Sequence, residues 1–372
     1  MSGIEIDKAL GVVNRLFDMA VEAGASDVHL VVGKPPLLRI SGDIVPVEGS
    51  KPLTKEMAEQ MVFSLVTEEE KDRFVGQKEL DIAHQTPAGV RFRINLHWEK
   101  RCVSLAARII PQEIPDMDSL DLPPVVQKMT EYPHGLVIVT GPTGSGKSTT
   151  LASMVESINR ETAANIITLE DPVEFMFTPA KSIVRQRQFG QDFLSFPEGL
   201  KHILRQDPDV VMVGEMRDPE TIATTLTIAE TGHLVFATLH TYSAAQTIDR
   251  IIDAMPTAQQ NQVRSQLALT LRAVIAQQLL PKIGGGRVAG REILVNNSAV
   301  ANLIREGQIA QIRNVLQTSA GEGMTTLAQD LTRLVALGLV EKEHANQFLR
   351  TSDQIRDDED VGRIAKRRGW IG

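Results

Sequence analysis

A glycine-rich stretch, GPTGSGKST at residues 141–149, constrains the fold of this chain more than any other feature. It matches the pattern G-x-x-x-x-G-K-[ST] and stands between an apolar run, LVIVT, and a segment of helical character, STTLASMVESIN. In such a loop the glycines let successive backbone N–H groups point at phosphate oxygens, at the N-terminus of a helix. A chance glycine-rich turn is the alternative, but the flanking strand and helix argue against it. The sequence therefore predicts a phosphate-binding loop formed by Gly141, Pro142, Thr143, Gly144, Ser145, Gly146, Lys147, Ser148 and Thr149.

Two residues of this loop have separate expected roles. We expect Lys147 to bridge the β- and γ-phosphates of ATP and Ser148 to offer its hydroxyl to Mg²⁺. The cofactors predicted from the loop are thus ATP and Mg²⁺.

Four short apolar runs surround and follow the loop: LVIVTG, NIITLED, DVVMVGE and HLVFATLH. Mostly helical segments separate them, and none shows a clean alternation of apolar and polar residues. Such runs are typical of strands covered on both faces, so we expect an α/β domain with a mostly parallel sheet. Its functional loops should lie at the carboxyl ends of the strands. After Thr257 we expect mainly helices, with PKIGGGR as one loop.

Carboxylates follow two of these runs at their carboxyl ends. Glu170 and Asp171 end one run, Glu174 lies just beyond, and Glu215 ends the next, whereas Asp209 begins that run and is predicted to be structural. A helix or turn cap is the alternative for Glu170 and Asp171. Phosphoryl transfer needs carboxylates for the metal and for the attacking water. We assign Glu215 and Glu174 to metal and water handling, leaving open which is the base, and count Ser148, Glu170 and Asp171 as ligands of nucleotide-bound Mg²⁺.

Two histidines mark the ends of the last run, in AETGHLVFATLHT. Asp218 and Pro219 begin a helix that should stop at Gly232, so this run completes a β-α-β unit with the one ending at Glu215. By strand direction His240 lies at the carboxyl end, near the phosphates, and is a candidate γ-phosphate sensor. His233 lies at the opposite end, where support of a domain or subunit contact is the expected role.

The first 110 residues have an α+β pattern. We expect a helix at 8–23, two short strands at 26–33 and 37–47, and a second helix at 54–74. An antiparallel pair of strands should follow at 91–98 and 103–110. Residues 111–124 have the proline and acidic content of a linker. In the stretch RFRIN, alternation puts Arg91 and Arg93 on one strand face, and a solvated basic face is the plain interpretation.

Composition limits the classes of function. The 372 residues carry a net charge of −8, which does not favour binding to nucleic acid, and the single Cys102 excludes an internal disulfide or a Cys₄ zinc site. No apolar stretch is long enough to span a bilayer, so we expect a cytosolic protein that would serve a membrane process only by docking. The charged tail, residues 352–372, is expected to be partly disordered.

The motifs together resemble the Walker A, Asp box, Walker B and His box of the type II and type IV secretion ATPases. Within that family the segments GASDVHL, LRQDPDVVMVGEMRDPETI and KIGGGRVAGREIL are most similar to the type IV pilus retraction ATPases. The resemblance implies a PAS-like N-terminal domain at 1–110, a linker at 111–124 and a RecA-like ATPase domain at 125–372, assembled as a ring hexamer. One departure stands in AVANLIREG, where Ala301 replaces the arginine of a motif tied to retraction.

The same resemblance implies the remaining roles and partners. It marks Arg93 and Arg108 as arginine fingers, so the expected catalytic set is Glu215, Glu174, His240, His233, Arg93 and Arg108. It also implies a cytoplasmic motor at the inner membrane that hydrolyses ATP to retract pili, docks on a platform protein of the pilus machine and works beside a paralogous motor ATPase. The alternatives are the accessory paralogue itself, a nucleotide-dependent scaffold, and a RecA-type nucleic-acid motor, which the acidic charge disfavours.

Overall fold

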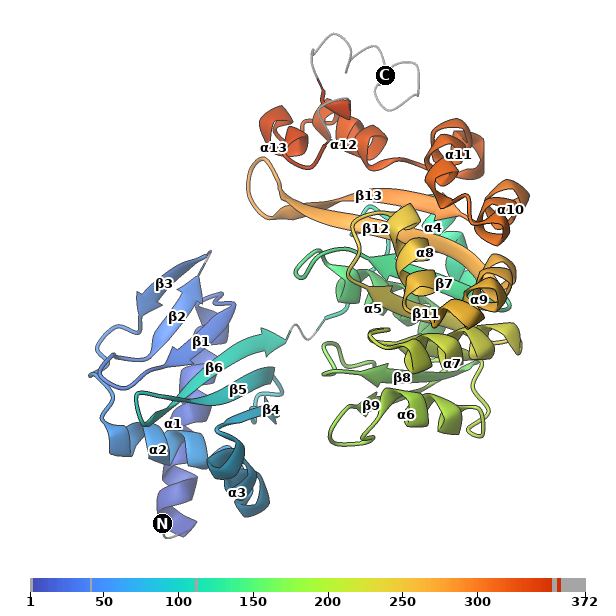
Figure 1. The fold of residues 1–372 in the computed structure, drawn as a ribbon. Helices are drawn as coiled ribbons and strands as arrows, with labels where there is room; N and C mark the ends of the chain where they lie inside the picture. Colours follow the sequence, from blue (N-terminus) through green and yellow to red (C-terminus); the bar gives the residue numbers. More distant parts are fainter. Residues whose placement is uncertain (1–2, 41, 111–112, 350–352, 356–372) are drawn as a thin grey trace. The chain divides into compact units, whose positions relative to one another are not determined.

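The computed structural model describes residues 3–40, 42–110, 113–349 and 353–355. Most of the tail predicted to be disordered therefore lies outside the described residues. The chain divides into two compact units, Met1–Glu113 and Ile114–Gly372 (Figure 1). The boundary lies between Glu113 and Ile114, within the segment 111–124.

The first unit contains a six-stranded antiparallel sheet in the order β3-β2-β1-β6-β5-β4. Its strands are β1 (Asp27–Leu30), β2 (Leu37–Ile40), β3 (Asp43–Pro46), β4 (Glu79–Gln85), β5 (Arg91–Glu99) and β6 (Cys102–Ile110). Three helices accompany the sheet: α1 (Gly3–Glu22), α2 (Lys55–Phe63) and α3 (Glu68–Gln77). Phe17 of α1, Phe74 of α3 and Phe92 of β5 are fully buried in the core between them.

Two predictions for this unit are wrong in detail. The single helix expected over 54–74 is two helices: Thr54 caps α2 as predicted, but Thr67 forms a capping box with Glu70 and starts α3. The run expected as one strand over 37–47 is a hairpin of β2 and β3, and β4 was not predicted. The pair predicted at 91–98 and 103–110 is confirmed as β5 and β6.

The second unit contains a seven-stranded sheet in the order β13-β12-β7-β11-β10-β8-β9. Its strands are β7 (Gly135–Thr140), β8 (Asn165–Glu170), β9 (Ile183–Gln188), β10 (Val210–Val213), β11 (Leu234–Leu239), β12 (Leu271–Pro281) and β13 (Arg287–Val295). All neighbouring pairs are parallel except β12 with β13. The mostly parallel sheet predicted from the four apolar runs is confirmed.

The structure adds three strands that the sequence patterns did not predict, β9, β12 and β13. The region after Thr257 is not mainly helical up to residue 297, because β12 and β13 form a long hairpin there. The predicted loop PKIGGGR is its turn, in which Gly284, Gly285 and Gly286 have positive φ angles. β12 has the sequence LRAVIAQQLLP, and a short apolar run such as its AVIA does not by itself separate a strand from a buried helix.

Helices cover both faces of this sheet. They are α4 (Pro124–Gln127), α5 (Lys147–Glu161), α6 (Phe196–Ile203), α7 (Pro219–Glu230), α8 (Ala244–Asp253), α9 (Thr257–Thr270), α10 (Ser298–Glu306), α11 (Ile312–Thr318), α12 (Leu327–Ala336) and α13 (Lys342–Asn346), with short 3₁₀ turns η1 (Lys128–Glu131), η2 (Ile309–Gln311) and η3 (Ala320–Glu322). As predicted, Asp218 caps α7 through its side chain and Pro219 is the first helical residue. Asp209 accepts a hydrogen bond from the Asn165 backbone N–H at 2.8 Å, in keeping with its predicted structural role.

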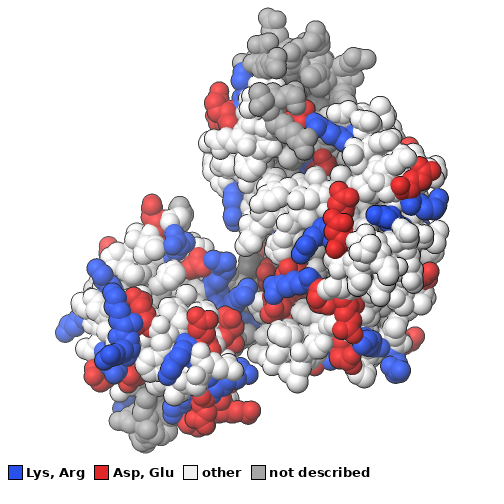
Figure 2. Space-filling model, viewed as in Figure 1, with Lys and Arg blue, Asp and Glu red and all other residues white. Residues whose placement is uncertain are grey.

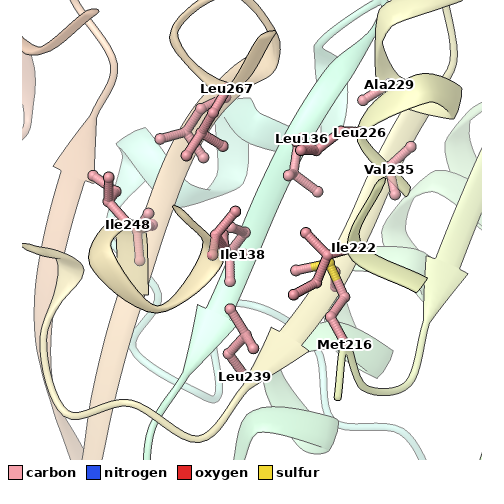
Figure 3. Close-up of a cluster of buried hydrophobic side chains, with 14 of the residues drawn as sticks. Leu136, Ile138, Met216, Ile222, Leu226, Ala229, Val235, Leu239, Ile248 and Leu267 are labelled. Carbon is pink, nitrogen blue, oxygen red and sulfur yellow. The ribbon is translucent and has the colours of Figure 1, made fainter. Parts of the chain in front are cut away.

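Alternate residues of the central strands face different layers of the core. Leu136 and Ile138 of β7 pack with residues of α7, α8 and α9, as Figure 3 shows for Leu226, Ile248 and Leu267. Val137 and Val139 of β7 instead pack in a second cluster with Leu151, Met154, Val155 and Ile158 of α5. Burial on both faces explains why the strand sequences show no alternation of polarity.

The start of the second unit is fastened to its C-terminal part. Leu122 is buried in the α5 cluster, and the Arg291 guanidinium of β13 donates to the carbonyl oxygens of Leu120 and Asp121 at 2.8 and 3.0 Å. Arg333 of α12 contacts the Asp121 carboxylate at 2.7 Å and the Asp330 carboxylate at 2.8 Å. Residues 120–122, predicted as linker, are thus a packed part of this unit.

Acidic and basic side chains are mixed on the visible face of each unit in Figure 2. On the face seen in Figure 2, red and blue side chains lie interspersed on both units. This pattern agrees with a chain whose 47 acidic residues only modestly exceed its 39 basic ones.

Candidate functional site

The glycine-rich loop lies between the end of β7 and the start of α5, as predicted. Lys147 is the first residue of α5, and the Gly146 that precedes it has a φ of 85°. Gly141 has a φ of 147°, and a Cβ atom there would lie 2.3 Å from the carbonyl oxygen of Gln277. A side chain at this position would therefore clash with the backbone of β12. The loop, at a helix N-terminus, fits the phosphates of a nucleotide.

Lys147 lies at the centre of the site. Its Nζ donates to the carbonyl oxygens of Gly141 and Pro142 at 2.8 and 3.0 Å, and lies 3.4 Å from Nδ1 of His240. Burial lowers the pKa of Lys147, and the charges of Glu215 and Glu174 oppose that shift. The ammonium group is thus partly desolvated and held by weak neutral acceptors that a phosphate can replace.

His240 joins Lys147 to the predicted catalytic carboxylate. Nε2 of His240 lies 3.3 Å from Oε1 of Glu215. Since the ammonium of Lys147 can only donate, Nδ1 is the acceptor and Nε2 carries the proton that faces Glu215. His240 and Glu215, each predicted at the carboxyl end of its run, therefore lie next to each other beside Lys147.

Arg217 is a member of this group that the sequence patterns did not single out. Its Nε contacts Oε2 of Glu215 at 2.8 Å, and its Nη1 lies 3.8 Å from Oδ2 of Asp171. The arginine therefore connects the acids at the ends of β8 and β10. The only sequence signal was a basic residue two positions after Glu215.

The acids at the end of β8 have different surroundings. Glu170 is 6% exposed and accepts hydrogen bonds from Thr168 Oγ1 at 2.6 Å and Gln186 Nε2 at 3.1 Å. Burial raises the pKa of Glu170 to about 7, against the hydrogen bonds that favour its charged form. Asp171 and Glu174 are exposed, which leaves their carboxylates more accessible to solvent and ions than that of Glu170. Mg²⁺ commonly takes few protein ligands besides phosphate and water. Of the predicted ligands, Ser148 lies in the first turn of α5 and Asp171 is exposed, whereas the carboxylate of Glu170 is buried and already hydrogen-bonded.

The raised pKa of Glu170 predicts a pH dependence of stability. Because the pKa in the folded chain lies above the ordinary value of 4.5, the folded state holds this proton more tightly than the unfolded state. The stabilisation is complete below about pH 4.5 and is lost as the pH rises through about 7. Relative to Glu170→Gln, the free energy of unfolding of the wild type should fall by about 1–3 kcal/mol between pH 5 and pH 8. Urea denaturation of both proteins without nucleotide would measure this, and parallel pH profiles would refute it.

His233 lies at the opposite end of β11 from His240. Its Nδ1 lies 3.1 Å from the Ile228 carbonyl oxygen and 3.1 Å from Thr231 Oγ1, at the C-terminal end of α7. These contacts hold Nδ1 of the ring against the end of α7, away from the phosphate loop. The polarity argument that separated the two histidines is confirmed.

Gln277 of β12 supports the loop from the neighbouring strand. The side chain is 2% exposed; its Nε2 donates to the Ser145 carbonyl oxygen at 2.6 Å and its Oε1 accepts from Thr150 Oγ1 at 3.0 Å. No sequence pattern singled it out, because β12 itself was not predicted and Gln277 is 132 positions away from Ser145.

In the first unit, Arg93 and Arg108 stand directly opposite each other on β5 and β6. Both are exposed, and Nε of Arg108 contacts Oδ1 of Asp27 at 2.8 Å. Asp27 is the register partner of Arg108 on β1, so its carboxylate offsets the repulsion between two like charges on one sheet face. The predicted alternation of β5 is confirmed, since Phe92 and Ile94 face the core.

Comparison with known proteins places these residues in context. Residues 2–286 match the family described as type II/IV secretion system protein. The chain is 43% identical over 335 residues to the type IV pilus retraction ATPase PilT of Pseudomonas aeruginosa, covering 90% of this chain and 97% of that protein. It is 45% identical to a twitching motility protein of Neisseria gonorrhoeae over 86% of each chain, and 36% identical to the P. aeruginosa pilus ATPase PilU over 92% of this chain and 90% of PilU.

A solved structure shows the same fold. The crystal structure of the pilus retraction motor PilT with bound ADP is similar with a TM-score of 0.85 and 42% identity, covering 94% of this chain and 98% of that one. The α/β arrangement described above, with an N-terminal unit and a mostly parallel ATPase sheet, is therefore shared with a nucleotide-binding relative.

Proposed function

Because the chain belongs to the type II/IV secretion system protein family, we propose that it is an ATP-hydrolysing motor that retracts type IV pili. The observation that carries the chemistry is the contact chain from Lys147 through His240 to Glu215 at the phosphate loop. The evidence for a role in pilus retraction is the similarity, over most of the chain, to PilT and to a twitching motility protein.

The proposed mechanism uses residues at one end of the sheet. Lys147 exchanges the carbonyl oxygens of Gly141 and Pro142 for the β- and γ-phosphates of ATP. Ser148 and the acids at the end of β8 would hold Mg²⁺, which would supply charge neutralisation of the phosphates. Glu215 orients the attacking water or accepts its proton, with Glu174 as the second candidate. His240, at 3.4 Å from Lys147, is the proposed γ-phosphate sensor.

We further propose a homohexameric ring in the cytoplasm, bound at the inner membrane to a platform protein of the pilus machine. No helix within the described ranges is both long and apolar enough to cross a membrane. A ring suits this chemistry because one subunit's hydrolysis can move its neighbours. A paralogous motor ATPase is the second proposed partner of the ring.

An accessory PilU-type role is the second candidate. The identity to PilT, 43%, exceeds that to PilU, 36%, which favours retraction. The observation that favours the accessory role is Ala301, which replaces the arginine of the retraction motif. Ala301 lies half-buried on α10 against the core of the second unit. A nucleotide-dependent scaffold is the third candidate, and the assembled Lys147, His240 and Glu215 argue against it.

The proposal is tested by steady-state ATPase measurement and light scattering of the purified protein, together with twitching in a P. aeruginosa strain lacking its own PilT. We expect Mg²⁺-dependent turnover, a mass of about six chains and restored twitching. Turnover without restored twitching would contradict the retraction function and favour the accessory role. Nucleotide binding without turnover would leave only the scaffold.

We propose that Arg93 and Arg108 act on the γ-phosphate. The fork of Arg108 beyond its Nε–Asp27 contact is suited to a phosphate, and Arg93 stands beside it. Arg93→Ala and Arg108→Lys should each lower turnover at least about tenfold while ADP affinity changes little. Lysine at 108 keeps a cation beside the buried Asp27. Arg73→Ala, at an exposed position on α3, is the control, and equal loss of ADP and ATP-analogue binding would show that the two arginines are structural instead.

A further inference from the structure

Three buried threonine hydroxyls connect the phosphate loop, His240 and α8. They belong to Thr140, the last residue of β7; Thr241, which follows His240; and Thr247, within α8. The exposed fractions of the three residues are 0%, 7% and 0%. We refer to these residues as the threonine chain.

The distances define a continuous series of hydrogen bonds. Thr140 Oγ1 lies 2.7 Å from Thr241 Oγ1, which lies 2.7 Å from Thr247 Oγ1, and Thr247 Oγ1 donates to the Ser243 carbonyl oxygen at 2.8 Å. The backbone N–H of Thr241 also donates to Thr140 Oγ1 at 2.9 Å. Carbonyl oxygens can only accept, so Thr247 donates to Ser243 and Thr241 donates to Thr247. The one proton of the Thr140 hydroxyl has three acceptors within reach: Thr241 Oγ1 and the carbonyl oxygens of Leu239 and Thr241, at 3.1 and 2.9 Å.

The threonine chain joins segments that are distant in sequence at the point where the nucleotide is expected. Thr140 directly precedes Gly141 of the phosphate loop, and Thr241 directly follows His240. Apolar side chains of the same three elements, Ile138, Leu239 and Ile248, lie in the core drawn in Figure 3. Thr241 is therefore held on two sides by hydroxyl groups whose own positions are fixed by the core, and this fixes the backbone that carries His240.

We propose that Thr241 is a positioning residue that sets His240 at the γ-phosphate, acting through its hydroxyl bonds to Thr140 and Thr247. The proposal rests on the proposed function, because it assumes a nucleotide at the phosphate loop. The other end of the threonine chain reaches the N-terminus of α8, where the Ala244 N–H donates to Glu292 of β13 at 2.9 Å. A displacement of His240 by the γ-phosphate would thus be transmitted to α8 and β13.

The test compares Thr241→Val with Thr241→Ser. Valine keeps the shape and removes both hydroxyl bonds, whereas serine keeps the hydroxyl. The valine variant leaves no neighbouring donor unpaired, because Thr140 Oγ1 also lies 3.1 Å from the Leu239 carbonyl oxygen and Thr247 retains Ser243. Thr225→Val is the matched control: Thr225 is fully buried, and its hydroxyl bonds the Thr221 carbonyl of its own helix.

The readout is the affinity of each full-length variant for AMP-PNP and for ADP, with Mg²⁺, by calorimetry. Thr241→Val should weaken the binding of AMP-PNP about five- to tenfold, the effect of one or two lost neutral hydrogen bonds. The affinity for ADP should change less than about twofold. Thr241→Ser and Thr225→Val should keep the wild-type ratio. In a His240→Ala background, Thr241→Val should have little further effect, since its action passes through that ring.

Three results would overturn the proposal. The first is an equal loss of ADP and AMP-PNP affinity in Thr241→Val. The second is the same loss of AMP-PNP affinity in Thr241→Ser. The third is a loss of AMP-PNP affinity that is fully additive with that of His240→Ala. ATP turnover of the wild type is measured separately. Its absence would overturn the motor function but would not change the comparison of AMP-PNP and ADP affinities among the variants. The two failures are therefore distinguishable.

Discussion

Replacing Lys147 with alanine is expected to reduce ATP turnover to background. The Lys147 ammonium is the cation nearest the loop carbonyls of Gly141 and Pro142, at 2.8 and 3.0 Å, and it is the group that would bridge the β- and γ-phosphates. The substitution also removes the donor to Nδ1 of His240 and leaves that ring free to turn away from Glu215. A coupled enzyme assay at saturating Mg·ATP measures the loss.

Two companion variants separate chemistry from folding. Lys147→Gln keeps most of the volume and a neutral donor but no charge, and we expect it to be equally inactive. Lys128→Ala removes an exposed lysine of η1 and should retain full turnover. Undiminished activity of Lys147→Ala, in a protein with wild-type thermal stability, would contradict the assignment of residues 141–149 as the nucleotide loop.

Glu215→Gln is expected to lower kcat by about 10²-fold or more with little change in nucleotide affinity. The glutamine keeps the shape of the side chain and a contact to His240 but cannot accept a proton from water. Glu215 is 21% exposed and contacts Arg217 at 2.8 Å, so the carboxylate is held in place at the strand end. Steady-state kinetics with ADP and AMP-PNP binding would measure the effect.

The matched control for this variant is Glu220→Gln, five residues further on in α7, where the carboxylate is exposed and pairs with Lys201. It should keep the wild-type kcat. A Glu215→Gln protein with normal kcat and a raised KM would make Glu215 a binding residue and transfer the role of base to Glu174.

The parts of the site that could be predicted belong to short contiguous motifs of the sequence. The loop at 141–149, the carboxyl-end position of Glu215 and the polarity that separates His240 from His233 all follow from one parallel β-α-β pattern. Strand direction predicted that His240 lies at the carboxyl end, near the phosphates, and in the structure its ring is 3.4 Å from Lys147 of the loop.

The parts that could not be predicted depend on contacts between distant segments. Gln277 reaches Ser145 from a strand whose apolar run did not distinguish strand from helix, and Thr140 meets Thr241 across 101 positions. The helix over 54–74 was predicted without its break, because the capping box at Thr67 competes with a helical pattern that continues past it. That capping box is local, whereas the buried contacts of Gln277 and Thr140 join distant segments and have no periodic signature in the sequence.

The Arg291 and Arg333 contacts have a mechanical consequence. They tie residues 120–121, where the chain enters the second unit, to β13 and α12. A pulling force applied from the N-terminal side therefore acts first on the contacts of Arg291 and Arg333. It reaches β7 and the phosphate loop only after these contacts break. In a forced-unfolding experiment, the entry segment and α12 should detach in one event, and the nucleotide end of the sheet should resist to a higher force.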